Sequence, residues 1–253
     1  MQTFLVWPDL VAYSGSSFST TRHSHFYTQL CLGNTAPFRL RGRDCKWHSY
    51  SAAFIPSGIS HETEHSEHAF TILLLDPLTT GSGILADLKI KADEPAIDVS
   101  HLFSKADIQE TLALMEKADQ SVRSNILKML ERHKTATPLR STDERILNSI
   151  ARIQDSKANL SLADLAIHAG ISPSRFRHLF REETGIAFSA YKIWMKTRNA
   201  ILFLSQRPDL ALAAYEGGFA DQAHFSRIFR RSFGMSPSGF SRSETFRVQI
   251  FGS

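Results

Sequence analysis

Arginine, histidine and serine side chains occupy the outward positions of two short segments in the last third of the chain. Each segment holds two phenylalanines four residues apart, a spacing that puts both rings on one face of a helix: Phe176 with Phe180, and Phe225 with Phe229. The polar residues that fall away from this buried stripe are Arg177, His178, Ser226 and Arg227. Because a guanidinium group can donate two hydrogen bonds to guanine, these helices have the chemistry to enter the major groove of DNA.

The elements that would position these side chains occur twice. One copy runs from Leu162 to Gly170 and the other from Leu210 to Gly218, and both fit Leu-x-x-apolar-Ala-x-x-x-Gly at an offset of 48 residues. The helix that bears the phenylalanines follows at an offset of 49, so the second turn is one residue longer. A single copy would fit a plain helical bundle as well, but the matched duplication predicts two helix-turn-helix units.

Three residue types in each copy suit a turn between two closely crossing helices. An alanine at the crossing lets the backbones approach, a glycine can adopt the left-handed conformation that ends the first helix, and a serine or aspartate can cap the second. These residues are Ala166, Gly170 and Ser172 in the first copy, and Ala214, Gly218 and Asp221 in the second.

Positive charge gathers in the same region. The chain has 253 residues and a net charge of +4, but the segment from residue 140 to the end carries +6 and the first 139 residues carry −2. The basic residues of this last segment are mostly arginine, which binds phosphate and base edges. A solvated basic surface would have the same charge. The charge therefore adds support to the DNA-binding prediction made from the repeat, but would not carry it alone.

The second copy and its tail resemble the signature of the AraC/XylS family of transcription regulators. The matching residues are Gly218, Phe219, Asp221, Gln222, His224, Phe225, Ser226, Arg227, Phe229, Arg230, Gly234 and Pro237, followed by Phe240, Ser241 and Arg242. The resemblance covers residues 144–242. It implies a seven-helix domain in which a connecting helix, near residues 189–205, holds two recognition helices about one turn of DNA apart.

The resemblance also implies which side chains meet DNA. The residues that would reach base edges are Ser174, Arg177, His178, Gln222, Ala223, His224, Ser226 and Arg227. Those that would contact phosphates, or else remain solvated charges, are Arg181, Lys192, Arg230 and Arg231. Ala213 departs from the family pattern, which has a larger aliphatic residue there, so we expect the second unit to be the less stable.

The N-terminal part predicts a different architecture. Strand-like segments at 28–32, 38–41, 51–56 and 70–75 are separated by turn residues, which indicates a small antiparallel barrel or sandwich. Apolar residues then recur at helical spacing from 104 to 134, with a break near 119–121. We therefore expect an α+β protein: a sensor domain at 1–100, a helical linker at 101–138, and a DNA-binding domain at 139–253 with two helix-turn-helix units and otherwise only helices.

His23 and His25 are two residues apart, and alternate positions on a strand face the same way, so both rings could point together into a barrel. Here the sequence resembles the cupin-like sensor domains that AraC-type regulators often carry, and metal-binding cupins add a third histidine, here His61. Three imidazoles suit zinc, iron, nickel or copper. Gln29 stands where such cupins have a glutamate. A divalent metal site, a sensor pocket without metal, and a degenerate barrel with structural histidines all remain open.

We expect a sequence-specific transcription regulator that binds double-stranded DNA and responds to a small ligand in the barrel, without a required cofactor and without enzymatic activity. Two alternatives are a metal-dependent cupin enzyme fused to a DNA-binding domain and a ligand-independent DNA binder. RNA polymerase and a second copy of the chain are further partners to consider. The apolar stripe at Leu112, Met115, Ile126 and Met129 would either pair subunits or pack on its own barrel.

The sequence also bears on the compartment. No stretch of about 18 apolar residues suggests a membrane helix, the N-terminus does not resemble a signal peptide, and Cys31 and Cys45 fit two free thiols better than a disulfide. We therefore expect a cytoplasmic protein of a bacterial type, with no membrane partner.

Overall fold

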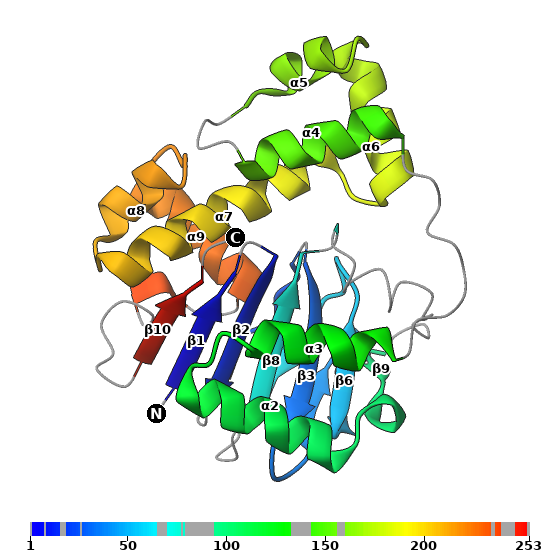
Figure 1. The fold of residues 1–253 in the computed structure, drawn as a ribbon, viewed down its shortest axis with the longest axis vertical. Helices are drawn as coiled ribbons and strands as arrows, with labels where there is room; N and C mark the ends of the chain where they lie inside the picture. The colour runs from blue at the N-terminus through cyan, green and yellow to red at the C-terminus, as the bar shows by residue number, and fades with distance from the viewer. Residues whose placement is uncertain are drawn as a thin grey trace.

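The computed structural model describes residues 2–7, 9–15, 19–25, 27–64, 70–76, 78, 94–132, 143–155, 160–233, 236–238 and 246–251. Its strands are β1 (Gln2–Val6), β2 (Leu10–Gly15), β3 (Thr28–Gly33), β4 (Phe38–Arg41), β5 (Trp47–Tyr50), β6 (Ala52–Ile55), β7 (Glu62–Thr63), β8 (Phe70–Leu75), β9 (Ile97–Asp98) and β10 (Phe246–Ile250). Its helices are the 3-10 helix η1 (Ser100–Leu102), α2 (Lys105–Lys117), α3 (Val122–Glu131), α4 (Glu144–Asp155), α5 (Leu162–His168), α6 (Pro173–Thr184), α7 (Phe188–Gln206), α8 (Leu210–Glu216) and α9 (Gln222–Phe233). Figure 1 shows the helical half of the chain above a barrel of strands.

Two sheets form this barrel. The larger has the strand order β10-β1-β2-β8-β3-β6-β9 and the smaller has the order β5-β4-β7. The four strands expected from the sequence are confirmed as β3, β4, β6 and β8. The α+β class predicted from the sequence is likewise confirmed.

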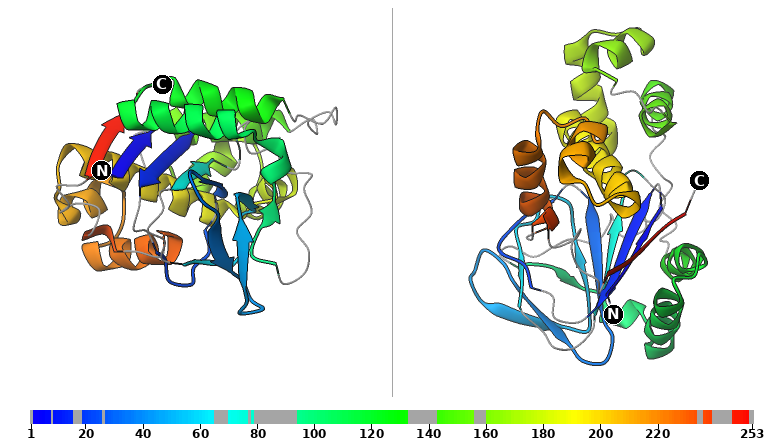
Figure 2. Two further views of the ribbon diagram at one scale, coloured as in Figure 1. Left: turned by 90° about the horizontal axis from the view of Figure 1, so that it is seen from below. Right: turned by 90° about the vertical axis from the view of Figure 1, so that its left-hand side faces the viewer.

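The large sheet is buried on both faces, as β8 shows, since all six of its residues are buried. Ile72 and Leu74 belong to the core inside the barrel, whereas Leu73 and Leu75 belong to the core shared with α2 and α3. This alternation follows from the period of two along a strand. Both helices lie across the outer face of the sheet (Figures 1 and 2).

The apolar stripe of α2 and α3 packs against the outer face of the large sheet. Met115, Ile126 and Met129 are fully buried and Leu112 is partly buried against the chain's own barrel. Of the two roles expected for the stripe, packing on the barrel is therefore the one that the structure shows, and the stripe offers no free surface for pairing subunits. The break near 119–121 is also found: Ala118 adopts a left-handed conformation that ends α2.

The duplicated segments fold as two helix-turn-helix units, α5 with α6 and α8 with α9. Gly170 and Gly218 have φ values of 65° and 73°, the left-handed region where a side chain is strained. Ser172 accepts a hydrogen bond from the amide of Arg175, and Asp221 accepts one from the amide of His224, so both caps form as expected. Helix α7 joins the two units and runs above the ends of the barrel strands (Figure 1).

The last strand, β10, corrects the expectation that the segment from 139 onward is purely helical. It pairs in parallel with β1 at the edge of the large sheet, with Phe4 opposite Val248. The chain thus returns to the N-terminal barrel after the second helix-turn-helix unit. Phe246, Val248 and Ile250 alternate with Arg247 and Gln249, a strand pattern that the expectation of a purely helical segment overlooked. The pairing of β10 with a strand more than 200 residues away leaves no local mark in the sequence.

Some expectations fall outside the described residues. These are the domain boundary at 138/139 and the motif residues Gly234, Phe240, Ser241 and Arg242. Cys31 and Cys45 are both free thiols, the first buried and the second exposed. Among the described residues, no helix combines the length and hydropathy that crossing a bilayer requires.

Replacing Gly217 with alanine is expected to destabilise the second unit. A Cβ atom at this position would lie 2.8 Å from both the Ala200 Cβ and the Lys196 carbonyl oxygen of α7, too close for either to tolerate without a backbone shift. We expect a loss of about 1–3 kcal/mol in the free energy of unfolding, measured with urea. Ala211→Ser on the exposed face of the same helix serves as the control, and equal stability of the two variants would contradict the packing described here.

Candidate DNA-binding surface and the cavity behind it

The first recognition helix, α6, presents its predicted base-contacting residues to solvent. Ser174, Arg177 and His178 are exposed. Phe176 and Phe180 on the opposite face are fully buried, and both stack edge-on against Phe188 at the start of α7 with ring centroids 5.5 Å apart. The aromatic contact fixes how far α6 rotates about its axis, and hence which side chains face outward.

The second recognition helix, α9, presents a more varied surface. Gln222, Ala223 and Arg227 are exposed, whereas His224 and Ser226 are half-buried. The His224 ring meets Phe219 edge-on, with ring centroids 5.4 Å apart, so this histidine also holds the turn. A hollow along the helix is lined by Gln222, Ala223, Ser226, Arg227, Arg230, Leu210 and the segment 236–238.

The predicted phosphate contacts divide into two kinds. Arg181, Arg230 and Arg231 are exposed at the ends of α6 and α9. Lys192 lies on α7 and is half-buried, and burial, together with the nearby charge of Lys196, lowers its pKa. Lys196 itself donates to the Gly218 carbonyl and so clamps the turn of the second unit, a role that the sequence pattern did not reveal.

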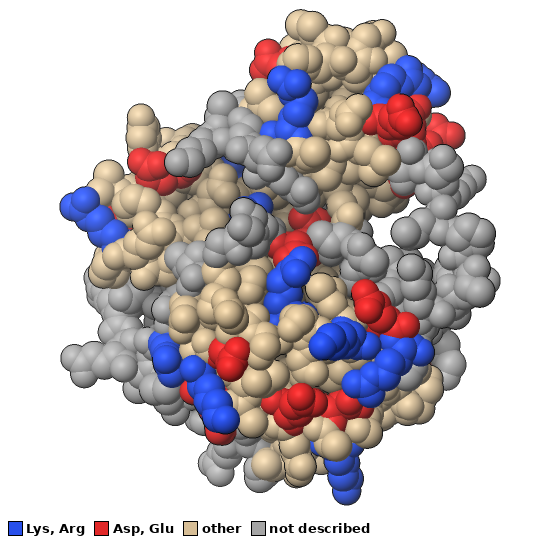
Figure 3. All heavy atoms as spheres, viewed as in Figure 1, with Lys and Arg blue, Asp and Glu red and all other residues tan. Residues whose placement is uncertain are grey.

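The face that carries α2 and α3 looks unlike a DNA-binding surface. There, acidic and basic side chains are mixed and no large patch of one sign forms (Figure 3). DNA carries a dense and uniform negative charge, so a mixed face offers it little attraction. The candidate DNA-binding residues lie instead on the recognition helices α6 and α9.

Helix α7 is fixed to the barrel by a buried polar contact at Asp76. This carboxyl group is fully buried just after β8 and accepts hydrogen bonds from the Leu78 amide, at 2.9 Å, and from the Tyr191 hydroxyl of α7, at 3.4 Å. Burial raises its pKa, an effect that its hydrogen bonds and the positive charge of Arg198 oppose. Arg198 is also buried, and burial lowers its pKa.

Helix α9 is fixed to the barrel through Tyr27. The hydroxyl of Tyr27 donates to the backbone carbonyl of Ser232, near the end of α9, at 2.6 Å. Its ring also packs on Trp194 of α7 and Phe233 of α9, with centroids 4.9 and 5.6 Å away. The side chain is fully buried, so a barrel residue forms part of the core of the second helix-turn-helix unit.

An apolar cavity lies between the barrel and these two helices. The barrel side includes Phe4, Val11, Ile72 and Leu74, and the helical side includes Ile201, Phe229 and Phe233. The space in which the centre of a water molecule can lie is about 40 Å³, so the cavity is small. A larger molecule could enter only by displacing lining side chains, and those of α7 and α9 are among them.

The three histidines predicted to meet do meet. His23, His25 and His61 are all buried, and each has a ring nitrogen within 4.8 Å of those of the other two. Desolvation lowers the pKa of His23 to about 4 and that of His25 to about 3, and it lowers the pKa of His61 as well. All three rings are therefore neutral at pH 7, the form in which imidazole binds a metal.

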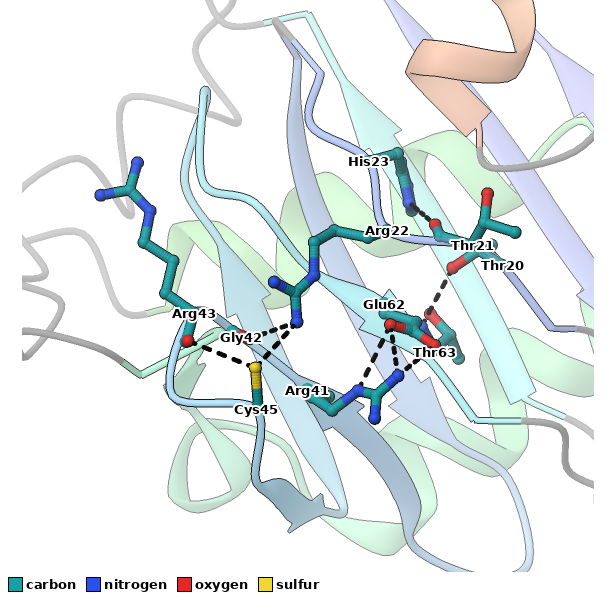
Figure 4. A network of polar contacts seen from close by, with 10 residues as sticks. All are labelled: Thr20, Thr21, Arg22, His23, Arg41, Gly42, Arg43, Cys45, Glu62 and Thr63. Carbon is teal, nitrogen blue, oxygen red and sulfur yellow. Dashed lines mark hydrogen bonds and ion pairs between the residues drawn. The ribbon is translucent and has the colours of Figure 1, made fainter.

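Backbone and side-chain contacts hold these rings in place. His23 and His61 exchange two backbone hydrogen bonds of 2.9 Å, which join their two segments. Beside them, the Thr63 amide donates to the Thr20 hydroxyl, and Arg41 forms a two-pronged ion pair with Glu62 (Figure 4). The histidine cluster thus sits on a braced part of the barrel wall.

Gln29 occupies the position where metal-binding cupins have a glutamate, and it contacts the cluster. Its Oε1 atom lies 2.9 Å from Nε2 of His25, and its Nε2 atom donates to Sγ of Cys31 at 3.0 Å. His25 places Nδ1 2.8 Å from the Tyr27 carbonyl, to which it donates, so its Nε2 carries a lone pair. The amide can donate to that lone pair when its NH2 group faces the ring.

Comparison with known proteins bears on the helical part first. Residues 165–243 match the family model described as "Helix-turn-helix domain". The arabinose operon regulatory protein of Escherichia coli (strain K12) is 38% identical over 101 residues, which are 39% of this chain and 35% of that protein. The chain therefore aligns with only about a third of the length of this relative.

Two longer likenesses cover most of the chain. The probable transcriptional regulator LumQ of Photobacterium leiognathi is 23% identical over 244 residues, which are 88% of this chain and 92% of that protein. The crystal structure of ToxT from Vibrio cholerae O395 superposes with a TM-score of 0.56 at 14% identity, covering 92% of this chain and 96% of that one. The order of a barrel followed by two helix-turn-helix units is therefore a fold seen before.

Replacing Asp76 with alanine is expected to loosen the contact between α7 and the barrel. The change leaves the buried Arg198 without the negative charge of Asp76 and the Tyr191 hydroxyl without this acceptor, so we expect a loss of about 1–3 kcal/mol in the free energy of unfolding. Glu110→Ala, at an exposed position of α2, is the control. Urea titration should separate the two variants, and a neutral Asp76→Ala would show that the carboxyl group does not anchor α7.

Proposed function

We propose that the chain is a ligand-responsive transcription regulator of the AraC type that binds specific DNA sequences, because residues 165–243 match a helix-turn-helix family model and the last part of the chain aligns with the arabinose operon regulatory protein. The observation that carries this proposal is the pair of recognition helices, α6 and α9, each with a buried phenylalanine face and an exposed polar face. The regulators among its relatives support a role in gene control and not in catalysis.

The length of α7 supports binding to neighbouring major grooves. Its 19 residues span about 28 Å at 1.5 Å per residue, which is close to the 34–36 Å of one turn of DNA. In this proposal, Arg177 and Arg227 contact guanine, Gln222 contacts adenine, and Arg181, Arg230 and Arg231 contact phosphates. The protein would act in the cytoplasm beside DNA, with RNA polymerase as a further partner.

The apolar cavity is the proposed site for the ligand. Its lining has a few polar groups, among them Thr20 and Thr63, within a wall of apolar side chains, which suits an elongated apolar molecule with a polar end. A solved structure of ToxT is described as bound to an unsaturated fatty acid. Entry of such a molecule would displace Phe229 or Ile201, and so shift α9 or α7 relative to the barrel.

Two arginine substitutions test the assignment of DNA contacts. Arg177→Ala removes a contact to base edges, so it should relax base preference at one position and cost about 1–3 kcal/mol on the best site only. Arg230→Ala removes a phosphate contact, so it should weaken specific and random DNA alike and flatten the dependence of affinity on salt.

The measurement is fluorescence anisotropy on a site selected from random DNA, at several salt concentrations. Lys105→Ala, at an exposed position at the start of α2, controls for the loss of one positive charge. If both arginine variants change specific and random binding equally, the division into base and phosphate contacts is wrong.

Graded filling of the cavity tests the ligand site. Val11 lines the cavity from the barrel side and belongs to neither recognition helix. We expect the affinity for oleate, used as the probe, to fall from wild type to Val11→Leu to Val11→Phe, because the larger side chains fill space that the probe would occupy. Isothermal titration calorimetry gives the affinities, and equal binding of oleate by all three proteins would place the ligand elsewhere.

A further inference from the structure

The histidine cluster has the internal hydrogen bonding of a prepared metal site. Each ring places Nδ1 near a backbone carbonyl: His23 at 2.9 Å from that of Thr21, His25 at 2.8 Å from that of Tyr27, and His61 at 3.1 Å from that of Ile59. A carbonyl only accepts, so each Nδ1 donates, and Nε2 of His23 and of His61 keeps its lone pair. On His25 the Oε1 atom of Gln29 lies 2.9 Å from Nε2, so this nitrogen is free to bind an ion only when the Gln29 amide turns away. Metal-binding histidines are oriented in this way, with the second nitrogen donating to a carbonyl or carboxylate.

One nitrogen in the cluster is unsatisfied. Nε2 of His61 is fully buried and has no hydrogen-bond partner among the described residues. A buried acceptor without a partner costs about 1–3 kcal/mol, and such groups are rare enough that each calls for an explanation. A metal ion bound between the three rings would satisfy this nitrogen, so the residues present fit such an ion.

We propose that His23, His25 and His61 bind one divalent transition-metal ion, and that its binding is transmitted to helix α9 through Tyr27. Zinc and other metals of the first transition row suit three neutral imidazoles, and the amide of Gln29 beside His25 is a neutral neighbour for the ion. The part of this proposal that concerns α9 rests on the proposed DNA-binding function, whereas the part that concerns the metal does not.

Contraction of the cluster is the source of the signal. The ligand nitrogens now lie within 4.8 Å of one another. Bonds of about 2.0–2.1 Å to a tetrahedral ion would bring them to about 3.4 Å, so at least one ring must move inward. His25 is the ring that is coupled to the helical half of the molecule.

The coupling runs through two contacts of Tyr27. The rings of His25 and Tyr27 stack with centroids 4.0 Å apart and an angle of 13° between their planes. The hydroxyl of the same Tyr27 donates to the Ser232 carbonyl at the end of α9. A shift of His25 therefore changes the contact between the barrel and the second recognition helix. His23, Tyr27 and Gln29 also line the apolar cavity, so a metal ion and a ligand would act on the same interface.

The metal site is tested by titrating the metal-free full-length chain with Co²⁺ and Zn²⁺. We expect one equivalent of Co²⁺ to give the visible absorption of a nitrogen-ligated ion, to be displaced by Zn²⁺, and to bind at least about 100-fold more weakly to His61→Gln. His101→Asn, which removes an exposed histidine, should bind as wild type does. Failure of the wild type to bind, or binding that survives His61→Gln, overturns the metal site.

The coupling is tested with Tyr27→Phe, which removes the hydrogen bond to Ser232 but keeps the ring. Zn²⁺ should change the affinity of the wild type for its selected DNA site by several-fold, and it should change that of Tyr27→Phe much less while binding to it equally well. An effect of Zn²⁺ that is the same in both proteins overturns the route through Tyr27. Binding of the metal-free wild type to its site is measured separately, so a failure of the proposed DNA-binding function is recognised as such.

Discussion

The buried carboxyl group of Asp76 joins the two halves of the molecule where β8 ends and α7 begins to cross the barrel. Helix α7 carries one helix-turn-helix unit at each end, so whatever fixes α7 also fixes both recognition helices. The charge of Arg198 lies nearby, and neither group is accessible to solvent. Asp76 would lose its hydrogen bonds from Leu78 and Tyr191 before it regained water, so separating α7 from the barrel here is costly. The interface therefore favours a single position of α7 on the barrel over a range of loosely packed positions.

Tyr27 extends that interface to α9. The residues inside the barrel and those of the helix-turn-helix units form one continuous apolar core, and the cavity is a gap within it. Packed cores respond to a new molecule by moving between alternative arrangements and not by stretching. A molecule in the cavity and an ion at the histidines would thus both act on the position of α7 and α9, which links the barrel to DNA binding without a long chain of contacts.

The two kinds of prediction made from the sequence fared differently for physical reasons. The repeats were predictable because Gly170, Gly218, Ser172 and Asp221 are dictated by local backbone geometry, which leaves a mark within a few residues. The histidine cluster was predicted from the two-residue spacing of His23 and His25, although the structure places no strand there and joins the cluster through an isolated bridge between His23 and His61. The contacts of Asp76 with Tyr191 and of Tyr27 with Ser232 join residues 115 and 205 positions apart, and no local pattern signals such pairs. The parallel pairing of β10 with β1 was missed for the same reason.

The barrel and the DNA-binding helices act as one mechanical unit, and amide hydrogen exchange of the full chain with and without its selected DNA site tests this most directly. DNA is expected to slow exchange in α6 and α9 and also to change exchange in β3 and α7, where the barrel meets the helices. Coupling between two sites is reciprocal, so a barrel that influences DNA binding must respond to DNA. Changes confined to the helix-turn-helix units, with β3 and the rest of the barrel unaffected, would contradict it.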